Sequence, residues 1–116
     1  MVRGRRSAVT PPGAVDVAAS AKVPSASPFL AVKVAGQRVL LARHPAGHVV
    51  AFPDACPHLG QPLRRAELEG ATLTCRHHRH RFALDDGACV WPAGPHDGGL
   101  ELLDVVEVDG RVWVRP

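Results

Sequence analysis

Four side chains that can bind a soft or borderline metal lie in two short segments rich in turn-forming residues. Cys56 precedes His58 by two residues in the first segment, and Cys75 precedes His78 by three in the second. Sixteen residues separate His58 from Cys75. A single cysteine near a histidine is explained equally well by a small buried thiol. Two such pairs in one chain instead predict a metal site with two sulfur and two nitrogen ligands.

The elements that must position these residues are predicted to be short strands. Gly and Pro contribute 11 residues each, which favours strands joined by turns over long helices. Turns are expected at residues 35–37 and 44–47, and Asp109-Gly110 between two alternating segments is typical of a tight hairpin. The predicted fold class is all-β, a small antiparallel β-sandwich or barrel with two irregular loops inserted. The strands are expected near residues 15–17, 29–34, 38–43, 48–52, 71–74, 101–108 and 111–114.

Length and charge limit the function classes. The chain has 116 residues, 46% apolar and 22% charged, which fits one globular domain. We expect a disordered tail over residues 1–13 and a single domain over residues 14–116. Three arginines of the tail account for the net charge of +3, because Lys plus Arg equals Asp plus Glu, 11 against 11, from Ser7 onward. The sequence has no basic stripe, few aromatic residues and no long apolar run, so neither nucleic-acid binding nor a membrane span is predicted.

The paired motifs resemble the Rieske family, whose members bind a [2Fe–2S] cluster with two loops of the pattern Cys-x-His-x-Gly and Cys-x-x-His. The resemblance extends from about Val15 to Pro116 and includes Gly60, Leu63, Phe82 and the closing Gly-Arg-Val-Trp-Val hairpin. It implies the Rieske domain fold and one [2Fe–2S] cluster per chain, with Cys56 and Cys75 on the buried iron and His58 and His78 on the outer iron.

The second loop leaves one question about the ligands open. Arg76 and Arg79 stand where the family often has Pro and Gly. His77 would give this loop the same Cys-x-His spacing as the first, although His78 fits the family pattern. His80 is a weaker candidate, and we expect both His77 and His80 to be exposed polar residues.

The remaining histidines and cysteine are predicted to lie outside the site. His44, His48 and His96 are expected to be solvated in turns, and Cys89 is expected to be a buried or half-exposed free thiol. Trp91 is expected to be a core residue, or to pack beside the cluster.

The resemblance also implies a reduction potential. In high-potential members, a Ser two residues and a Tyr four residues after the second histidine donate hydrogen bonds to sulfur. His80 and Phe82 occupy these positions here. Phe82 has no hydrogen-bond donor, and His80 is not an equivalent hydroxyl, so the reduced cluster lacks this stabilisation. Rieske centres span roughly −150 to +300 mV, and we therefore expect the potential of this one near the lower end.

The function implied by the resemblance is electron transfer, not catalysis. We expect a small monomeric Rieske ferredoxin that carries one electron from a flavin-dependent reductase to a terminal oxygenase of the dioxygenase or toluene-type monooxygenase kind. The alternatives are the oxygenase itself, which needs a further domain for mononuclear iron, a nitrite reductase small subunit, and a structural zinc module. Arg5-Arg6 resembles a twin-arginine export signal, but Pro11-Pro12-Gly13 and Asp16 interrupt the apolar stretch that follows. We therefore expect a cytoplasmic protein.

Overall fold

The computed structural model describes residues 10–92 and 99–116, and these form three antiparallel sheets with no α-helix among them. The first sheet has the strand order β1-β10-β9, the second β2-β3-β4 and the third β5-β6-β7-β8. One 3₁₀ turn, η1, follows β1 at Ser20–Lys22. The strands are β1 Val15–Ala19, β2 Leu30–Val34, β3 Gln37–Arg43, β4 Val49–Pro53, β5 Glu67–Glu69, β6 Thr72–Thr74, β7 Arg81–Ala83, β8 Cys89–Trp91, β9 Asp104–Val108 and β10 Arg111–Arg115.

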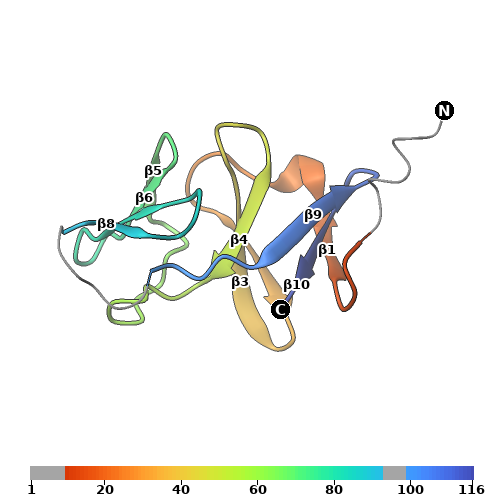
Figure 1. The fold of residues 1–116 in the computed structure, drawn as a ribbon, viewed down its shortest axis with the longest axis horizontal. Coiled ribbons are helices and arrows are strands. Elements are labelled where there is room, and N and C mark those ends of the chain that lie inside the picture. Colours follow the sequence, from red (N-terminus) through yellow and green to blue (C-terminus); the bar gives the residue numbers. More distant parts are fainter. Residues whose placement is uncertain (1–9, 93–98) are drawn as a thin grey trace.

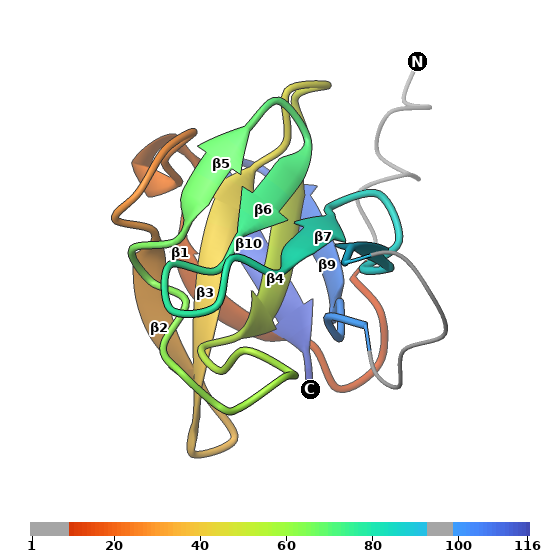
Figure 2. The same ribbon diagram turned by 90° about the vertical axis from the view of Figure 1, so that its left-hand side faces the viewer.

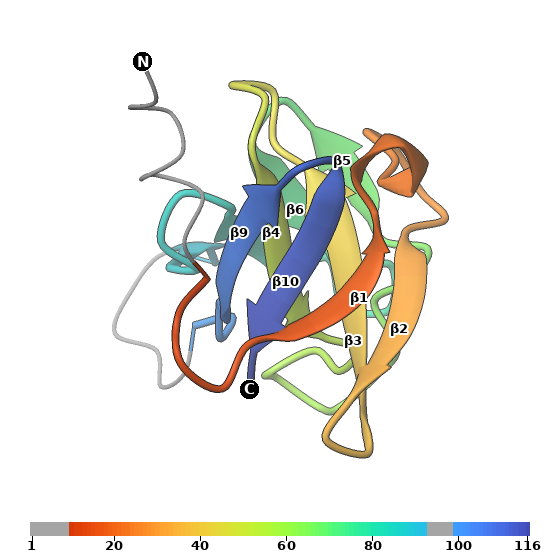
Figure 3. The same cartoon turned by 90° about the vertical axis from the view of Figure 1, so that its right-hand side faces the viewer.

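The three sheets form three layers, with β2-β3-β4 in the middle. Figure 2 shows β5, β6 and β7 in front of this middle sheet, and Figure 3 shows β9, β10 and β1 on its other side. Seen edge-on in Figure 1, the third sheet lies at one end of the molecule and the first sheet at the other. The predicted all-β class with inserted loops is therefore confirmed.

The middle sheet is buried on both faces, and strand β3 shows this most clearly. Leu40 and Ala42 belong to the core between the second and third sheets, whereas Val39 and Leu41 belong to the core between the first and second. Successive side chains of a strand point to opposite faces. A continuous apolar run such as residues 39–42 is therefore the pattern expected of a strand that is covered on both sides.

Short turns set the register of the hairpins. Ala35 and Gly36 join β2 to β3, and Asp109 and Gly110 join β9 to β10; all four have positive φ. This is the geometry of a two-residue hairpin turn whose twist matches that of the strands. Both hairpins agree with the sequence prediction. Three strands of three residues each, β5, β7 and β8, were not predicted, although the equally short β6 lies within the predicted strand 71–74.

Most of the predicted tail, and His96, lie outside the described residues. No helix among the described residues is long and apolar enough to cross a membrane.

Truncation of either of two neighbouring residues should reveal the double burial of the middle sheet. We expect Leu40→Ala and Leu41→Ala each to lower the free energy of unfolding by about 2–5 kcal/mol, because both side chains are fully buried but in different cores. Lys33→Ala, at an exposed position of β2, should stay within about 0.5 kcal/mol. Chemical denaturation measures all three. A near-neutral effect of one leucine variant would contradict the three-layer arrangement.

Candidate metal centre

Two loops at the same end of the molecule carry the four candidate ligands. The first loop follows β4 and leads to β5; the second connects β6 to β7 (Figure 2). Each follows a largely buried strand, so its cysteine remains in the core while the following residues reach the surface. Cys56 and Cys75 are buried, whereas His58 and His78 are exposed.

The two loops close on their cysteines with the same pair of backbone hydrogen bonds. The Cys56 amide donates to the Gln61 carbonyl at 2.7 Å, and the Gly60 amide donates to the Cys56 carbonyl at 2.7 Å. In the second loop, the Cys75 amide donates to the His80 carbonyl and the Arg79 amide to the Cys75 carbonyl, both at 2.9 Å. The residue four positions after each cysteine therefore plays the same part in both loops, although the sequences differ.

That fourth position requires a left-handed backbone. Gly60 has φ +76° and Arg79 has φ +60°. For a residue with a Cβ atom this conformation is costly. Arg79 adopts it nonetheless, so the departure from glycine that the sequence shows at this position does not change the hydrogen-bonded shape of the loop.

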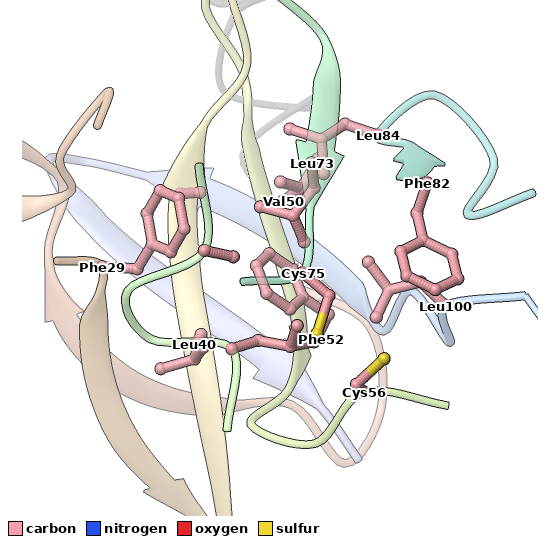
Figure 4. Packing of buried hydrophobic residues seen from close by; sticks show 13 residues of the cluster. Phe29, Leu40, Val50, Phe52, Cys56, Leu73, Cys75, Phe82, Leu84 and Leu100 are labelled. Carbon is pink, nitrogen blue, oxygen red and sulfur yellow. The ribbon is translucent and has the colours of Figure 1, made fainter. Parts of the chain in front are cut away.

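The thiol pair lies at the base of the two loops. Figure 4 shows the sulfur atoms of Cys56 and Cys75 pointing into the same space, beside Phe52, Phe82 and Leu100. Burial raises the pKa of the Cys56 thiol, and the Cys75 thiol, within hydrogen-bonding reach, adds to this rise. The backbone amides of His58 and Leu59 donate toward Cys56 Sγ and act in the opposite direction. These amides can support a negatively charged sulfur.

The imidazole pair lies on the outer side of the loops. The rings of His58 and His78 have centroids 5.2 Å apart and planes at 68°. Two imidazoles on one tetrahedral ion, with metal–nitrogen distances of about 2.0–2.1 Å, would have centroids roughly 5 Å apart. The spacing of His58 and His78 is thus compatible with shared coordination.

His77 and His80 occupy different positions from His78. His77 is exposed and lines a hollow with several arginines, as predicted for a surface residue. His80 corrects our expectation: it is half-buried and its ring stacks on that of His58, with centroids 3.9 Å apart and planes at 24°. Parallel stacked rings cannot both direct a ring nitrogen at one nearby ion, because imidazole lone pairs lie in the ring plane.

The structure also places three residues that were predicted to lie outside the site. His44 is not solvated: it is 8% exposed, and its Nε2 atom lies 2.7 Å from Asp85 Oδ1. Trp91 is not a core residue, since half of its surface is exposed. Cys89 is a half-buried free thiol, as predicted.

The sequence prediction missed Asp54 as a residue that fixes the first loop. Its carboxylate accepts a hydrogen bond from the Leu63 amide at 2.7 Å and lies 3.5 Å from Arg38, so it joins the two ends of the loop. An Asp placed just before a loop that begins with Cys-Pro was a signal that could have been used.

The described residues contain no group of three or more His, Cys, Asp or Glu side chains converging on one point. The four candidate ligands are arranged instead as a buried thiol pair and an exposed imidazole pair.

Comparisons with known proteins give a consistent result. The family model of the Rieske [2Fe-2S] domain matches residues 13–104. The toluene-4-sulfonate monooxygenase system iron-sulfur subunit TsaM1 of Comamonas testosteroni is 35% identical over 80 residues, 66% of this chain and 23% of its own length. The oxygenase component of dicamba O-demethylase from Stenotrophomonas maltophilia is 35% identical over 83 residues, which are 66% and 24% of the two chains. This chain therefore spans about a quarter of the length of these relatives.

Solved structures support the same fold. The apo form of dicamba monooxygenase superposes with a TM-score of 0.79 at 28% identity, covering 90% of this chain and 33% of the other. A protein named as a nitrite reductase (NADPH) small subunit superposes with a TM-score of 0.72 at 20% identity, covering 89% of this chain and 98% of the other. At that identity the second likeness concerns the fold alone.

The equivalent loop positions should respond differently to substitution. We expect Gly60→Ala to lower the free energy of unfolding by about 1–2 kcal/mol, because alanine resists positive φ. Arg79→Gly should leave stability unchanged or raise it by up to about 1 kcal/mol, since relief of this cost outweighs the added flexibility of the unfolded chain. Thermal unfolding of the metal-free protein measures both. A clear loss of stability in Arg79→Gly would show that the loops are not equivalent.

Proposed function

The chain belongs to the Rieske [2Fe-2S] domain family, and we propose that it carries single electrons from a flavin-dependent reductase to a terminal oxygenase, using Cys56, Cys75, His58 and His78 as cluster ligands. The observation that carries the proposal is the pairing of two buried thiols with two exposed imidazoles on loops of identical hydrogen bonding. Two thiolates and two neutral imidazoles are the ligand set that a Rieske cluster requires.

The residues present fit the cluster. The space between the loops has soft sulfur ligands on its inner side and nitrogen ligands on its outer side, and backbone amides point at Cys56 Sγ. Among the described residues, the buried Nδ1 atom of His80 has no hydrogen-bond partner. When bound, the cluster takes up and releases one electron at a time.

The residues of the chain then have two different roles, one on the buried side of the site and one at the surface. Cys56 and Cys75 anchor the buried side, and the core around Phe52 and Phe82 keeps water from it. His58 and His78 lie at the surface, so a redox partner that docks there would approach the cluster edge through their rings. Electron transfer between two redox proteins needs no substrate pocket, and we propose that the chain is a carrier and not a catalyst.

A second candidate function is favoured by the comparisons. The two relatives named above, an iron-sulfur subunit of a monooxygenase system and an oxygenase component, are about four times as long as the matched region. The described domain could serve as the electron-accepting Rieske domain of such an oxygenase, with the same cluster and ligands. The mass of the native protein in its source cells, determined by immunoblotting, distinguishes the ferredoxin from the oxygenase domain: a band near 12.3 kDa supports the ferredoxin.

We further propose that the carrier is a cytoplasmic monomer.

Several arginines lie on or beside the two loops that carry the imidazole pair, and we propose that they bind the acidic surface of the redox partner. Six of the eleven Lys and Arg residues from Ser7 onward lie at this end. A hollow of about 680 Å³ is lined by Arg38, Asp54, Pro62, Arg64, Arg65, Arg76 and His77, and a second hollow is lined by Arg79, Arg81 and Trp91.

The acidic residues at this end offset only part of that charge. Asp54 pairs with Arg38, and Glu67 lies 3.7 Å from Arg79. Within the described part of the chain, Arg65 and Arg76 form no ion pair. Positive charge beside the electron exit would speed encounter with an acidic partner.

Substitution of the ligands tests the proposed site. We expect Cys56→Ser, Cys75→Ser, His58→Ala and His78→Ala each to abolish the visible absorbance and the bound iron and sulfide. His77→Ala, on the same loop, is the matched control and should leave a coloured protein. A bleached His77→Ala together with a coloured His78→Ala would show that the second loop uses the other histidine. A colourless wild-type protein that binds zinc would support the structural zinc module.

If the arginines bind the redox partner, the rate of electron transfer should depend on salt concentration. The second-order rate constant for reduction by the flavin reductase, measured by stopped flow, should fall as NaCl rises, because salt screens exposed charges. Arg65→Glu and Arg76→Glu should each lower it about tenfold at low salt. Lys22→Glu, in η1 away from the loops, is the control and should have little effect. A rate independent of salt would refute the arginine surface but not the ligand set.

The potential predicted from the sequence can be measured directly. Phe82 is buried and provides no hydrogen-bond donor to the thiols beside it. We expect protein-film voltammetry at neutral pH to place the potential in the lower part of the range of roughly −150 to +300 mV. A potential in the upper part would favour a quinol-linked role.

A further inference from the structure

We propose that Trp91 is the apolar contact that holds the electron-donating redox protein beside the second loop. The inference rests on the proposed function, and both candidate functions require such a donor. Trp91 differs in kind from the arginines that attract the partner, because it acts after the two surfaces have met. The partner surface that fits has an apolar side chain flanked by carboxylates.

An irregularity in strand β8 places Trp91 at the surface. Arg81 on β7 pairs with Trp91, and the next residue of β7, Phe82, pairs with Cys89. Strand β8 therefore has one extra residue between these two pairs. In a regular strand, residues two apart share a face, so Trp91 would point to the core that Cys89 contacts. The extra residue moves Trp91 to the face of Arg81 instead.

The exposure of the Trp91 indole indicates a contact with another protein. Half of its surface is exposed, and it is the largest of the exposed apolar side chains among the described residues. Tryptophan is highly buried on average in folded proteins, and it is enriched at protein interfaces. Strand irregularities of this kind often redirect a side chain next to a functional site.

The surroundings of Trp91 define the chemistry of its partner. Trp91 lines a hollow of about 310 Å³ together with Arg79 and Arg81. The hollow adjoins the second loop, because Arg79 directly follows the proposed ligand His78. Arg81 forms no ion pair within the described part of the chain. The hollow therefore offers space for an apolar side chain and, beside it, a cation that a carboxylate of the partner can neutralise.

The arginines and Trp91 should act on different steps of binding. Exposed charges mainly change the association rate and its dependence on salt. A well-packed aromatic contact at the centre of an interface mainly slows dissociation, and Trp and Arg are the residue types that most often dominate binding energy. We therefore assign encounter to the arginines and the lifetime of the complex to Trp91.

Binding kinetics of the cluster-loaded protein to a flavin-dependent reductase test this assignment. We expect Trp91→Ala to raise the dissociation constant about tenfold through faster dissociation, with an unchanged dependence of the association rate on NaCl. Trp91→Phe keeps an aromatic ring and should lose only part of the affinity. Val15→Ala is the control, because Val15 is also an exposed apolar residue but lies on β1, in the sheet on the other side of the molecule.

Hydroxyl-radical footprinting of the wild-type protein gives a readout that needs no variant. We expect the reductase to protect the Trp91 indole from oxidation, measured by mass spectrometry of the peptide that contains it. Trp113, which is half-buried on β10 in the first sheet, should be oxidised equally with and without the reductase. Footprinting decides the question even where Trp91→Ala loses the cluster.

Each contrary result has a distinct meaning. An unprotected Trp91 indole in the complex, or an unchanged dissociation rate in a cluster-loaded Trp91→Ala, would overturn the role of Trp91 and leave the ligand set intact. A slower association with unchanged dissociation would also overturn it, since Trp91 would then act in encounter. A loaded wild-type protein that accepts no electron from the reductase would instead overturn the proposed function.

Discussion

Each cysteine of the site is held by the loop that follows it, and the arrangement of the site depends on this constraint. Two backbone hydrogen bonds turn each loop back on its own cysteine. The thiol then stays with the core, while the residues two and three positions later reach the surface. Repeated in two loops, this shape produces buried sulfur and exposed imidazole. It also fixes the fourth residue at positive φ, which explains why Gly60 and Arg79 share a conformation despite their chemistry.

The three layers supply the base on which these loops stand. The middle sheet contributes Leu40, Ala42, Val50 and Phe52 to the same core as Cys56 and Cys75. On its other face it packs against the β1-β10-β9 sheet, away from the site. The thiol end of the site is therefore buried, whereas its histidines and arginines are exposed. This division suits a protein that must protect a cofactor and still present it to a partner.

Most of the fold and much of the candidate site could be predicted from the sequence, because both depend on local patterns. Residues 39–42 and the Asp109-Gly110 turn indicated strands and hairpins, and the spacing of Cys and His indicated the loops. Contacts between distant residues could not be predicted. The burial of His44 depends on Asp85, 41 residues away, and the stacking of His80 on His58 joins two loops. Neither pairing leaves a periodic signal. Trp91 was expected in the core or beside the cluster, but it lies on the three-residue strand β8 and half of its surface is exposed.

The proposed site requires that the two loops hold one [2Fe–2S] cluster through two cysteines and two histidines. Pulsed electron paramagnetic resonance of the dithionite-reduced protein tests it most directly, because coupling to ¹⁴N counts the imidazoles bound to the reduced iron. With this ligand set we expect a single spin per chain with two distinct histidine nitrogen couplings. A spectrum without nitrogen coupling, or with only one coupled histidine, would contradict the assignment of His58 and His78.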